Sequence, residues 1–290
     1  MLQKFIYFLE YEKRFSSHTI RAYEKDLKQF FEYEKLNTSN DIINVTHFQV
    51  REWLTHLINS NLTKRSANRK LATLRSFYKW LRNEGLIVQN PLARVKSPKV
   101  EKRLPVFAKE SELSLESLDA LFDQNFSGIR DRLMFELFYQ TGVRLSELIH
   151  LKESDITSDY IKVLGKRNKE RLIPISSDLF QSISTFIQIK SAKGFKIEYL
   201  LILDNGKKLY PTFVYRKINH YLSLATNMDR KSPHVLRHTF ATHMLNRGSG
   251  LETLKDLLGH ANLSATQIYT HNSFAQLTSI YSQAHPRGRK

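Results

Sequence analysis

Three imidazoles and one guanidinium gather in the segment SPHVLRHTFATHML, which spans residues 232–245. If a helix begins at the Ser-Pro step, His234, Arg237 and His238 lie at i, i+3 and i+4 on one face. Two histidines at that spacing can chelate zinc, but Val235 stands where an HExxH metalloprotease carries its glutamate. The cationic Arg237 also disfavours a divalent ion. The segment therefore predicts an anion-binding site and no metal.

A second arginine suits the same anion. In TGVRLSELIHL, Arg144 follows Gly142 at the start of an expected helix, and Glu147 lies one turn further on, where it can orient the guanidinium. Two guanidiniums can hold a phosphate through bidentate hydrogen bonds, which two lysines cannot do. The pair of arginines favours a phosphate as the bound anion.

Further side chains supply proton carriers and a nucleophile. Lys166 lies at the expected tip of a hairpin in LGKRNKER, where a basic turn can enter a DNA groove and donate a proton. In LLGHANLSATQIYTH, His260 precedes Tyr269 by nine residues. The sequence has no carboxylate cluster suited to a two-metal nuclease and no GxxxxGK[ST] phosphate loop. This inventory suits metal-free attack on a phosphodiester.

Four stretches of the chain closely resemble the four catalytic boxes of the tyrosine recombinase (phage integrase) family: TGVRLSEL, GKRNKERLIPI, HVLRHTFATHML and LLGHANLSATQIYTH. Within that family they are most similar to bacterial Xer site-specific recombinases. The resemblance implies a mostly α fold with a small β-hairpin, in two domains that form a clamp around DNA. One is an all-helical, SAM-like core-binding domain and the other an α+β catalytic domain. It also implies chemistry that needs no metal, no ATP and no other cofactor.

By that resemblance, Tyr269 attacks a DNA phosphodiester, forms a 3′-phosphotyrosyl link and frees a 5′-hydroxyl. Glu147 supports the first arginine, and Lys166 is the expected general acid for the leaving oxygen. His238 and His243 are interpreted as structural residues. The catalytic set that the resemblance implies is Arg144, Lys166, His234, Arg237, His260 and Tyr269.

The same resemblance implies partners for the enzyme. It is expected to act on double-stranded DNA as a homo-tetramer, or paired with a second recombinase, and to resolve chromosome dimers at a dif-like site. A septal DNA translocase is the expected activator. The C-terminal segment from about Asn272, with Phe274, Leu277 and Ile280 at helical spacing, is expected to dock on a neighbouring subunit as an exchange helix. Alternatives are an integrase, transposase or invertase of a mobile element, a type IB topoisomerase-like enzyme, and a non-catalytic DNA-binding protein.

Composition agrees with a nucleic-acid partner. Lys and Arg total 45 against 28 Asp and Glu, which gives a net charge of +17 and favours a polyanion. No apolar run approaches the roughly 20 residues that span a bilayer, and the charged N-terminus MLQKFIYFLEYEKRF lacks the features of a signal peptide. Cysteine is absent, which excludes disulfides and thiolate chemistry. A cytoplasmic protein without membrane contact is expected.

The elements that position these groups fall into two parts. Residues 1–96 read as a helical core-binding domain, 97–107 as a basic linker, and 108–290 as the catalytic domain, in which DYIKVLGKRNKERLIPIS predicts a β-hairpin. In the first part, helices are expected to begin at Ser16 or Ser17 and at Thr46.

The longest expected helix, TKRSANRKLATLRSFYKWLRNEG, begins at Thr63 and is closed by Gly85. Within the helix only Glu84 offsets seven cations, so we expect its basic face to bind the DNA backbone and supply affinity rather than sequence reading. The predicted DNA contacts are Lys64, Arg65, Arg69, Lys70, Arg75 and Lys79.

Overall fold

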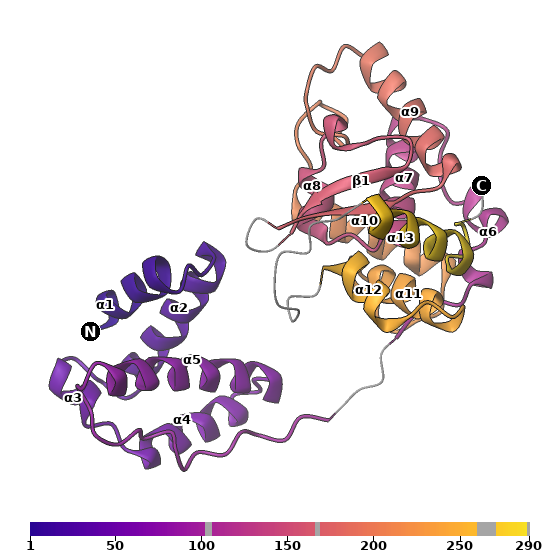
Figure 1. Ribbon diagram of the computed structural model, residues 1–290. Coiled ribbons are helices and arrows are strands. Elements are labelled where there is room, and N and C mark those ends of the chain that lie inside the picture. Colours follow the sequence, from indigo (N-terminus) through magenta and orange to yellow (C-terminus); the bar gives the residue numbers. More distant parts are fainter. Residues whose placement is uncertain (102–105, 166–168, 260–270, 289–290) are drawn as a thin grey trace. The chain divides into compact units, whose positions relative to one another are not determined.

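The computed structural model in Figure 1 describes residues 1–101, 106–165, 169–259 and 271–288. The chain divides into two compact units, residues 1–103 and 104–290, and each has its own hydrophobic core. Both units are mostly helical, and the sheet found in the described residues is one two-stranded hairpin in the second unit. The predicted fold class, mostly α with a small β-hairpin, is confirmed. No helix in the described part of the chain is long and apolar enough to span a bilayer.

Helix starts in the N-terminal unit follow from capping side chains. The hydroxyls of Ser16, Thr38, Thr46 and Thr63 each accept the backbone N–H three residues on, which satisfies a donor that has no partner inside the helix. The starts predicted at Ser16, Thr46 and Thr63 are thereby confirmed. The elements are α1 (Leu2–Tyr7), the π-helical turn η1 (Phe8–Glu12), α2 (Ser17–Tyr33), α3 (Ser39–Ile43), α4 (His47–Asn59) and α5 (Lys64–Asn83).

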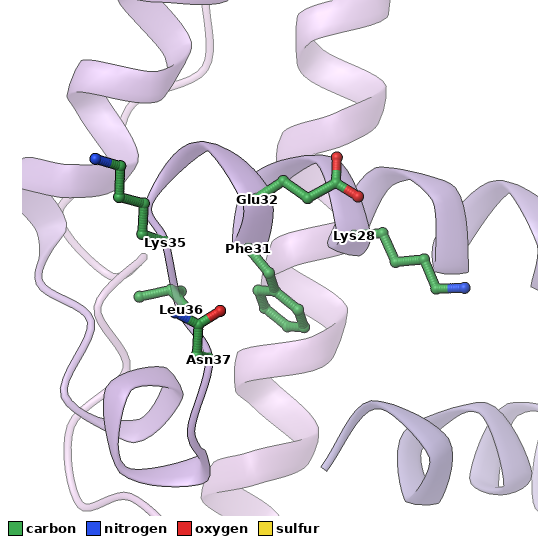
Figure 2. A pocket seen from close by; sticks show the side chains of 6 residues that line it. All are labelled: Lys28, Phe31, Glu32, Lys35, Leu36 and Asn37. Carbon is green, nitrogen blue, oxygen red and sulfur yellow. The ribbon is translucent and has the colours of Figure 1, made fainter.

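The core of this unit is built around α5. Leu71, Leu74 and Phe77 are fully buried on one face of the helix, which packs against α2 and α4. At its end Gly85 adopts a left-handed φ of 72°, the conformation that favours glycine after a helix. A surface pocket lies where α2 ends (Figure 2). It is lined by Lys28, Phe31, Glu32, Lys35, Leu36 and Asn37. None of these is a predicted site residue.

The segment that leaves α5 stays fastened to the same unit. Arg75 donates to the Val95 carbonyl oxygen at 2.7 Å and to the Ser97 hydroxyl at 2.9 Å. Asn68 donates to the carbonyl oxygen of Pro98 at 2.9 Å. Arg51 of α4 donates to the carbonyl oxygen of residue 94 at the same distance. Residues 94–98 therefore lie along the N-terminal unit.

The C-terminal unit, residues 104–290, is arranged around α7. Most residues of α7 are buried, and the helix packs against α9 and α11. The predicted hairpin is confirmed: β1 and β2 pair antiparallel, with Val163 opposite Arg171 and Leu164 opposite Glu170. The elements are η2 (Ser111–Leu113), α6 (Leu115–Asp119), α7 (Phe126–Thr141), α8 (Leu145–His150), η3 (Glu153–Asp155), β1 (Tyr160–Leu164), β2 (Glu170–Pro174), α9 (Ser177–Ala192), α10 (Pro211–Ala225), α11 (Pro233–Asn246), α12 (Leu251–Leu258) and α13 (His271–Ala284).

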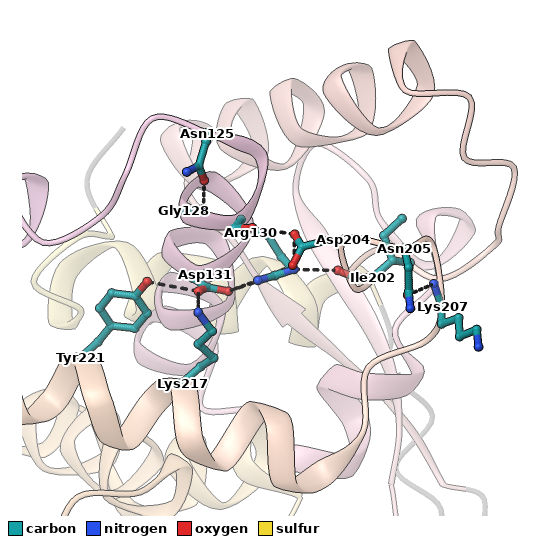
Figure 3. Close-up of polar contacts among 11 residues, drawn as sticks. Asn125, Gly128, Arg130, Asp131, Ile202, Asp204, Asn205, Lys207, Lys217 and Tyr221 are labelled. Atoms are coloured by element: carbon teal, nitrogen blue, oxygen red, sulfur yellow. Dashed lines mark hydrogen bonds and ion pairs between the residues drawn. The ribbon is translucent and has the colours of Figure 1, made fainter.

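A charged cluster joins α7 to α10 and to the loop before it (Figure 3). Arg130 and Asp131 are both fully buried and pair with each other at 2.8 Å. Arg130 also reaches Asp204, while Asp131 receives Lys217 and the Tyr221 hydroxyl from α10. Two cations face two carboxylates, so this buried cluster is balanced in charge and stabilises the packing of α7.

In this single chain the C-terminal helix α13 packs on the C-terminal unit. Leu277, Tyr281 and Ala284 belong to the hydrophobic core of that unit. His285, which is fully buried, donates from Nε2 to the Tyr139 carbonyl oxygen at 3.2 Å and accepts the backbone N–H of Arg287 at Nδ1. Docking of this helix on a neighbouring subunit stays a prediction.

Candidate active site

A left-handed turn at Gly142 directs Arg144 into the site. Gly142 ends α7 with a φ of 59°, and a Cβ atom there would lie 2.6 Å from the ring of Phe240, so a larger residue would be strained and would displace that ring. Two residues later Arg144 is the N-cap of α8, as the sequence predicts. Its backbone N–H donates to the Glu147 carboxylate at 2.7 Å, and the connection between the two helices is fixed by this bond.

Glu147 lies between two guanidiniums. Arg144 donates from Nη1 to Oε1 at 2.7 Å. Arg171 of β2 donates from Nη1 and Nη2 to the two carboxylate oxygens, both at 2.8 Å. Burial alone would raise the pKa of Glu147, but the hydrogen bonds and charge of Arg171, followed by those of Arg144, lower it to about 2. The carboxylate is therefore ionised at neutral pH.

Three arginines converge on the C-terminal end of α12. Arg171 donates from Nε to the Leu257 carbonyl oxygen at 2.8 Å, Arg237 from Nη2 to that of Leu258 at 2.6 Å, and Arg144 from Nη2 to that of Gly259 at 2.7 Å. The last carbonyls of a helix have no intrahelical donors and carry the negative end of its dipole. The end of α12 is thus held by one arginine per carbonyl.

Positive charge is in excess at this cluster. The guanidiniums of Arg144, Arg171 and Arg237 face one carboxylate, that of Glu147, which leaves two unbalanced positive charges. Burial, and then the charges of Arg144 and Arg171, lower the pKa of Arg237 to about 10, so it is still protonated at neutral pH. The side chain of Arg144 is 31% exposed. The cluster therefore suits an anion that approaches from solvent.

The histidines of α11 differ in how deeply they are buried. The helix begins at Pro233, as predicted, and His234 in its first turn is exposed. His238 is half-buried. His243 is 2% exposed; its Nδ1 lies 3.0 Å from the Tyr139 hydroxyl, and its Nε2 donates to the Ala108 carbonyl oxygen at 2.9 Å. The structural interpretation of His243 is confirmed.

Three predicted catalytic residues, Lys166, His260 and Tyr269, lie outside the described residues. The described residues that precede Lys166 and His260 in the chain lie beside the cluster of Arg144, Arg171 and Arg237. Gly165 directly precedes Lys166. Helix α12, whose last carbonyls the arginines hold, ends at Leu258, two residues before His260. Among the described residues no three His, Asp or Glu side chains gather closely enough to hold a metal ion.

Arg171 is the site residue that sequence reasoning missed. It lies on β2 with its side chain 4% exposed, on the same face as the buried Ile173. Side chains two apart in a strand share a face. The run ERLIP could therefore have shown an arginine at an inward position, which needs a buried partner.

The predicted DNA contacts on α5 differ in the exposure of their side chains. Lys70 is 6% exposed and donates to the buried Asp26 at 2.8 Å, so its prediction as a DNA contact is wrong: it neutralises a carboxylate inside the unit. Arg69 also pairs with Asp26 yet keeps a half-exposed side chain. Arg75 is half-buried and fastens the segment after α5. The cations that remain exposed along the helix are Lys64, Arg65, Arg69, Lys79 and Arg82.

Comparison with known proteins places this fold and site in a family. Residues 107–276 match the phage integrase family, and residues 2–85 match its N-terminal SAM-like domain. The chain belongs to the phage integrase family and is a tyrosine recombinase, an enzyme of site-specific DNA recombination.

Within that family, tyrosine recombinases named XerC are among the relatives of this chain. The chain is 40% identical to a tyrosine recombinase XerC of Staphylococcus saprophyticus, covering 99% of this chain and 98% of that protein. It is 34% identical to a tyrosine recombinase XerC of Chlorobaculum tepidum, covering 99% and 94%.

Solved structures share the fold. A XerH site-specific recombinase bound to a palindromic difH substrate, in a post-cleavage complex, has a TM-score of 0.71 at 19% identity, covering 99% of this chain and 81% of that one. A lambda integrase dimer bound to a COC′ core site has a TM-score of 0.68 at 18% identity, covering 92% and 98%.

Proposed function

We propose that this recombinase cleaves DNA with Tyr269 as nucleophile and resolves chromosome dimers at a dif-like site. The main support for this proposal is that Arg144 and Arg237 both bind the end of α12. The segment that holds His260 and Tyr269 begins at that same end. Two guanidiniums beside the nucleophile's segment suit a phosphodiester, whose non-bridging oxygens gain charge during attack.

Each side chain then has a chemical task. Arg144 and Arg237 stabilise the charge that develops on the phosphate, and Glu147 holds Arg144 in place. A free tyrosine has a pKa near 10 and is a weak nucleophile at neutral pH, so Tyr269 must lose its proton as it attacks. Lys166 protonates the leaving 5′-oxygen, and His234 and His260 assist by hydrogen bonding or proton transfer. The phosphotyrosyl link conserves the bond energy for religation, so this mechanism calls on neither ATP nor a metal.

The exposed cations of α5 bind the DNA backbone in this proposal, and the two units hold the duplex as a clamp. Four protomers, or two pairs with a second recombinase, act on two synapsed sites, with α13 exchanged between neighbours. The relatives named XerC, and the XerH complex with a difH substrate, support a dif-like target. A septal DNA translocase as activator, and a cytoplasmic location, belong to the same proposal.

A covalent trap tests the chemistry and the target together. The protein is incubated with sheared genomic DNA of its source in EDTA and denatured, and the attached fragments are sequenced, with Tyr269→Phe as control. Fragments that converge on one chromosomal site and vanish in the control support the proposal. Adducts at the ends of mobile elements would replace dimer resolution with integration, and scattered adducts would favour a topoisomerase-like activity.

A cross-link tests the exchange of α13. The ring of Phe274 on α13 lies 5.4 Å from that of Tyr160 on β1, centroid to centroid, and the chain has no native cysteine. Cysteines at both positions, joined by a short bismaleimide, are expected to link within one chain in the free protein and between chains on DNA. Links that stay within one chain on synapsed DNA would refute the exchange.

A further inference from the structure

We infer that Arg171 is a positioning residue for DNA cleavage: it shares the charge of Glu147 and so leaves the guanidinium of Arg144 available to the scissile phosphate. The inference rests on the proposed function, because it concerns the same phosphate. Family resemblance assigned no role to this residue, and the mechanism above does not use it.

Arg171 cannot reach the phosphate itself. Its side chain is 4% exposed, and three of its nitrogens are engaged by Glu147 and the Leu257 carbonyl oxygen. Two glycines enclose it: a Cβ atom on Gly259 would lie 3.2 Å from Nη1, and one on Gly165 would lie 3.5 Å from the same atom. Any effect of Arg171 on cleavage must therefore pass through a neighbour.

Glu147 is the neighbour that can transmit such an effect. Its carboxylate faces Arg144 from its own helix cap and Arg171 from β2, and it also acts on the charge of Arg237 from α11. The described end of α12 presents only backbone carbonyls to these arginines. Without Arg171, the buried carboxylate would pair with Arg144 alone and neutralise the charge needed by the phosphate.

Removing Arg171 should change the titration of Glu147 as well. Among the groups that lower the pKa of this carboxyl, Arg171 comes first and Arg144 second, while burial opposes both. In Arg171→Gln the pKa of Glu147 therefore rises. Below the raised value the carboxyl is neutral, and Arg144 regains its full charge for the phosphate.

The experiment measures single-turnover adduct formation at saturating DNA, on a nicked duplex of the sequence recovered by the covalent trap. The variants are Arg171→Gln, Arg171→Lys, Glu147→Gln and the Arg171→Gln/Glu147→Gln double variant. Arg171→Gln is expected to slow cleavage on the order of 10-fold, less than loss of a group that contacts the phosphate. Arg171→Lys, which keeps the charge, retains more of the rate. The double variant is faster than Arg171→Gln, because no carboxylate is left to neutralise Arg144.

A pH profile separates this role from a merely structural one. The rate of Arg171→Gln relative to wild type should rise as the pH falls towards the raised pKa of Glu147, and the rate of the double variant relative to Glu147→Gln should stay constant. Arg130→Gln, which removes a buried arginine from the balanced cluster, is the matched control and should show no such pH dependence in its folded fraction.

Two results would overturn the inference. One is a double variant as slow as Arg171→Gln with a constant rate ratio across pH, which would mean that Arg171 acts only by holding Leu257. If Arg171→Gln does not fold, Arg171→Lys is compared with the double variant in its place. The other is a pKa of Glu147, measured by carbon-13 NMR, that is the same in Arg171→Gln as in wild type. That titration needs no DNA, so it tests Arg171 even if wild type forms no Tyr269-dependent adduct and the proposed function fails.

Discussion

Two charged clusters of the C-terminal unit differ in their charge balance. Around Arg130, two cations face two carboxylates, and the pair at its centre is fully buried. Around Glu147, three arginines face one carboxylate, and Arg144 is partly exposed. A balanced buried cluster needs no further partner, whereas an excess of positive charge that is partly exposed favours an anion from solvent. The balance of charge, more than the number of charges, distinguishes a cluster that stabilises packing from the proposed phosphate site.

The largest effect is expected in the balanced cluster. Asp131→Ala leaves Arg130 without its paired carboxylate and Lys217 and Tyr221 without their acceptor, so the free energy of unfolding should fall by about 3–5 kcal/mol. Urea denaturation measures it. Arg132→Ala, which breaks the exposed pair with Asp119, is the control and should cost about 1 kcal/mol or less. If Asp131→Ala lowered the cleavage rate of the folded fraction by a large factor, the two clusters would not be separate in function.

The next effect is in the unbalanced cluster. Arg237→Ala should lower the rate of adduct formation by roughly 100- to 1,000-fold, because one of two guanidiniums that stabilise the phosphate charge is lost. Circular dichroism checks that the variant is folded. His238→Ala, one residue further along α11, should keep most of the rate. A comparable loss in that variant, without unfolding, would contradict the assignment of His238 as structural.

Acid tests the ionisation of Glu147, with a smaller expected effect. Because the pKa of Glu147 is lowered from 4.5 to about 2 in the folded protein, its ionisation stabilises the fold above pH 4.5. That contribution is lost as the pH falls from 4.5 towards 2. Over this window the stability of wild type relative to Glu147→Gln should fall by up to about 1.4 kcal/mol per pH unit. A difference that does not change with pH would show that Glu147 is not held as an ion.

The smallest effect is expected on α5. Arg65→Ala should reduce the slope of log binding constant against log salt by about 0.9, as one phosphate contact is lost. Lys79→Ala should act in the same way. Lys70→Ala should leave the slope unchanged and lower stability instead, because it removes a partner of the buried Asp26. Equal slopes for Arg65→Ala and wild type would remove the exposed face of α5 from the DNA interface.

Sequence reasoning located what depends on near neighbours. The caps at Ser16 and Thr63, the hairpin, and the pairing of Arg144 with Glu147 one turn away all follow from short spacings. Counting charges along α5 gave a wrong prediction of Lys70 as a DNA contact, because the carboxylate that neutralises it, Asp26, lies on another helix and 44 residues away. Partners at that separation are set by tertiary packing, which periodicity within one helix cannot show.

Arg171 was missed for a related reason. The motif that contains it was interpreted through Lys166 at the hairpin tip. The side chain of Arg171 instead points inward to Glu147, 24 residues earlier. Inward and outward positions of a strand are recognisable by alternation, so the burial of Arg171 could be predicted. Its partner and its contact with α12 could not, because they require the strand, α8 and α12 to be placed together.

The fastening of residues 94–98 to the N-terminal unit limits how far the two units can separate. With Pro98 held, the tether consists of residues 99–107, before Ala108 is fixed to α11 through Thr239 and His243. Because the two units belong to one chain with only nine residues between these anchors, binding of one unit to a duplex makes binding of the other an intramolecular step, whose effective concentration is set by the chain rather than by the amount of protein in solution.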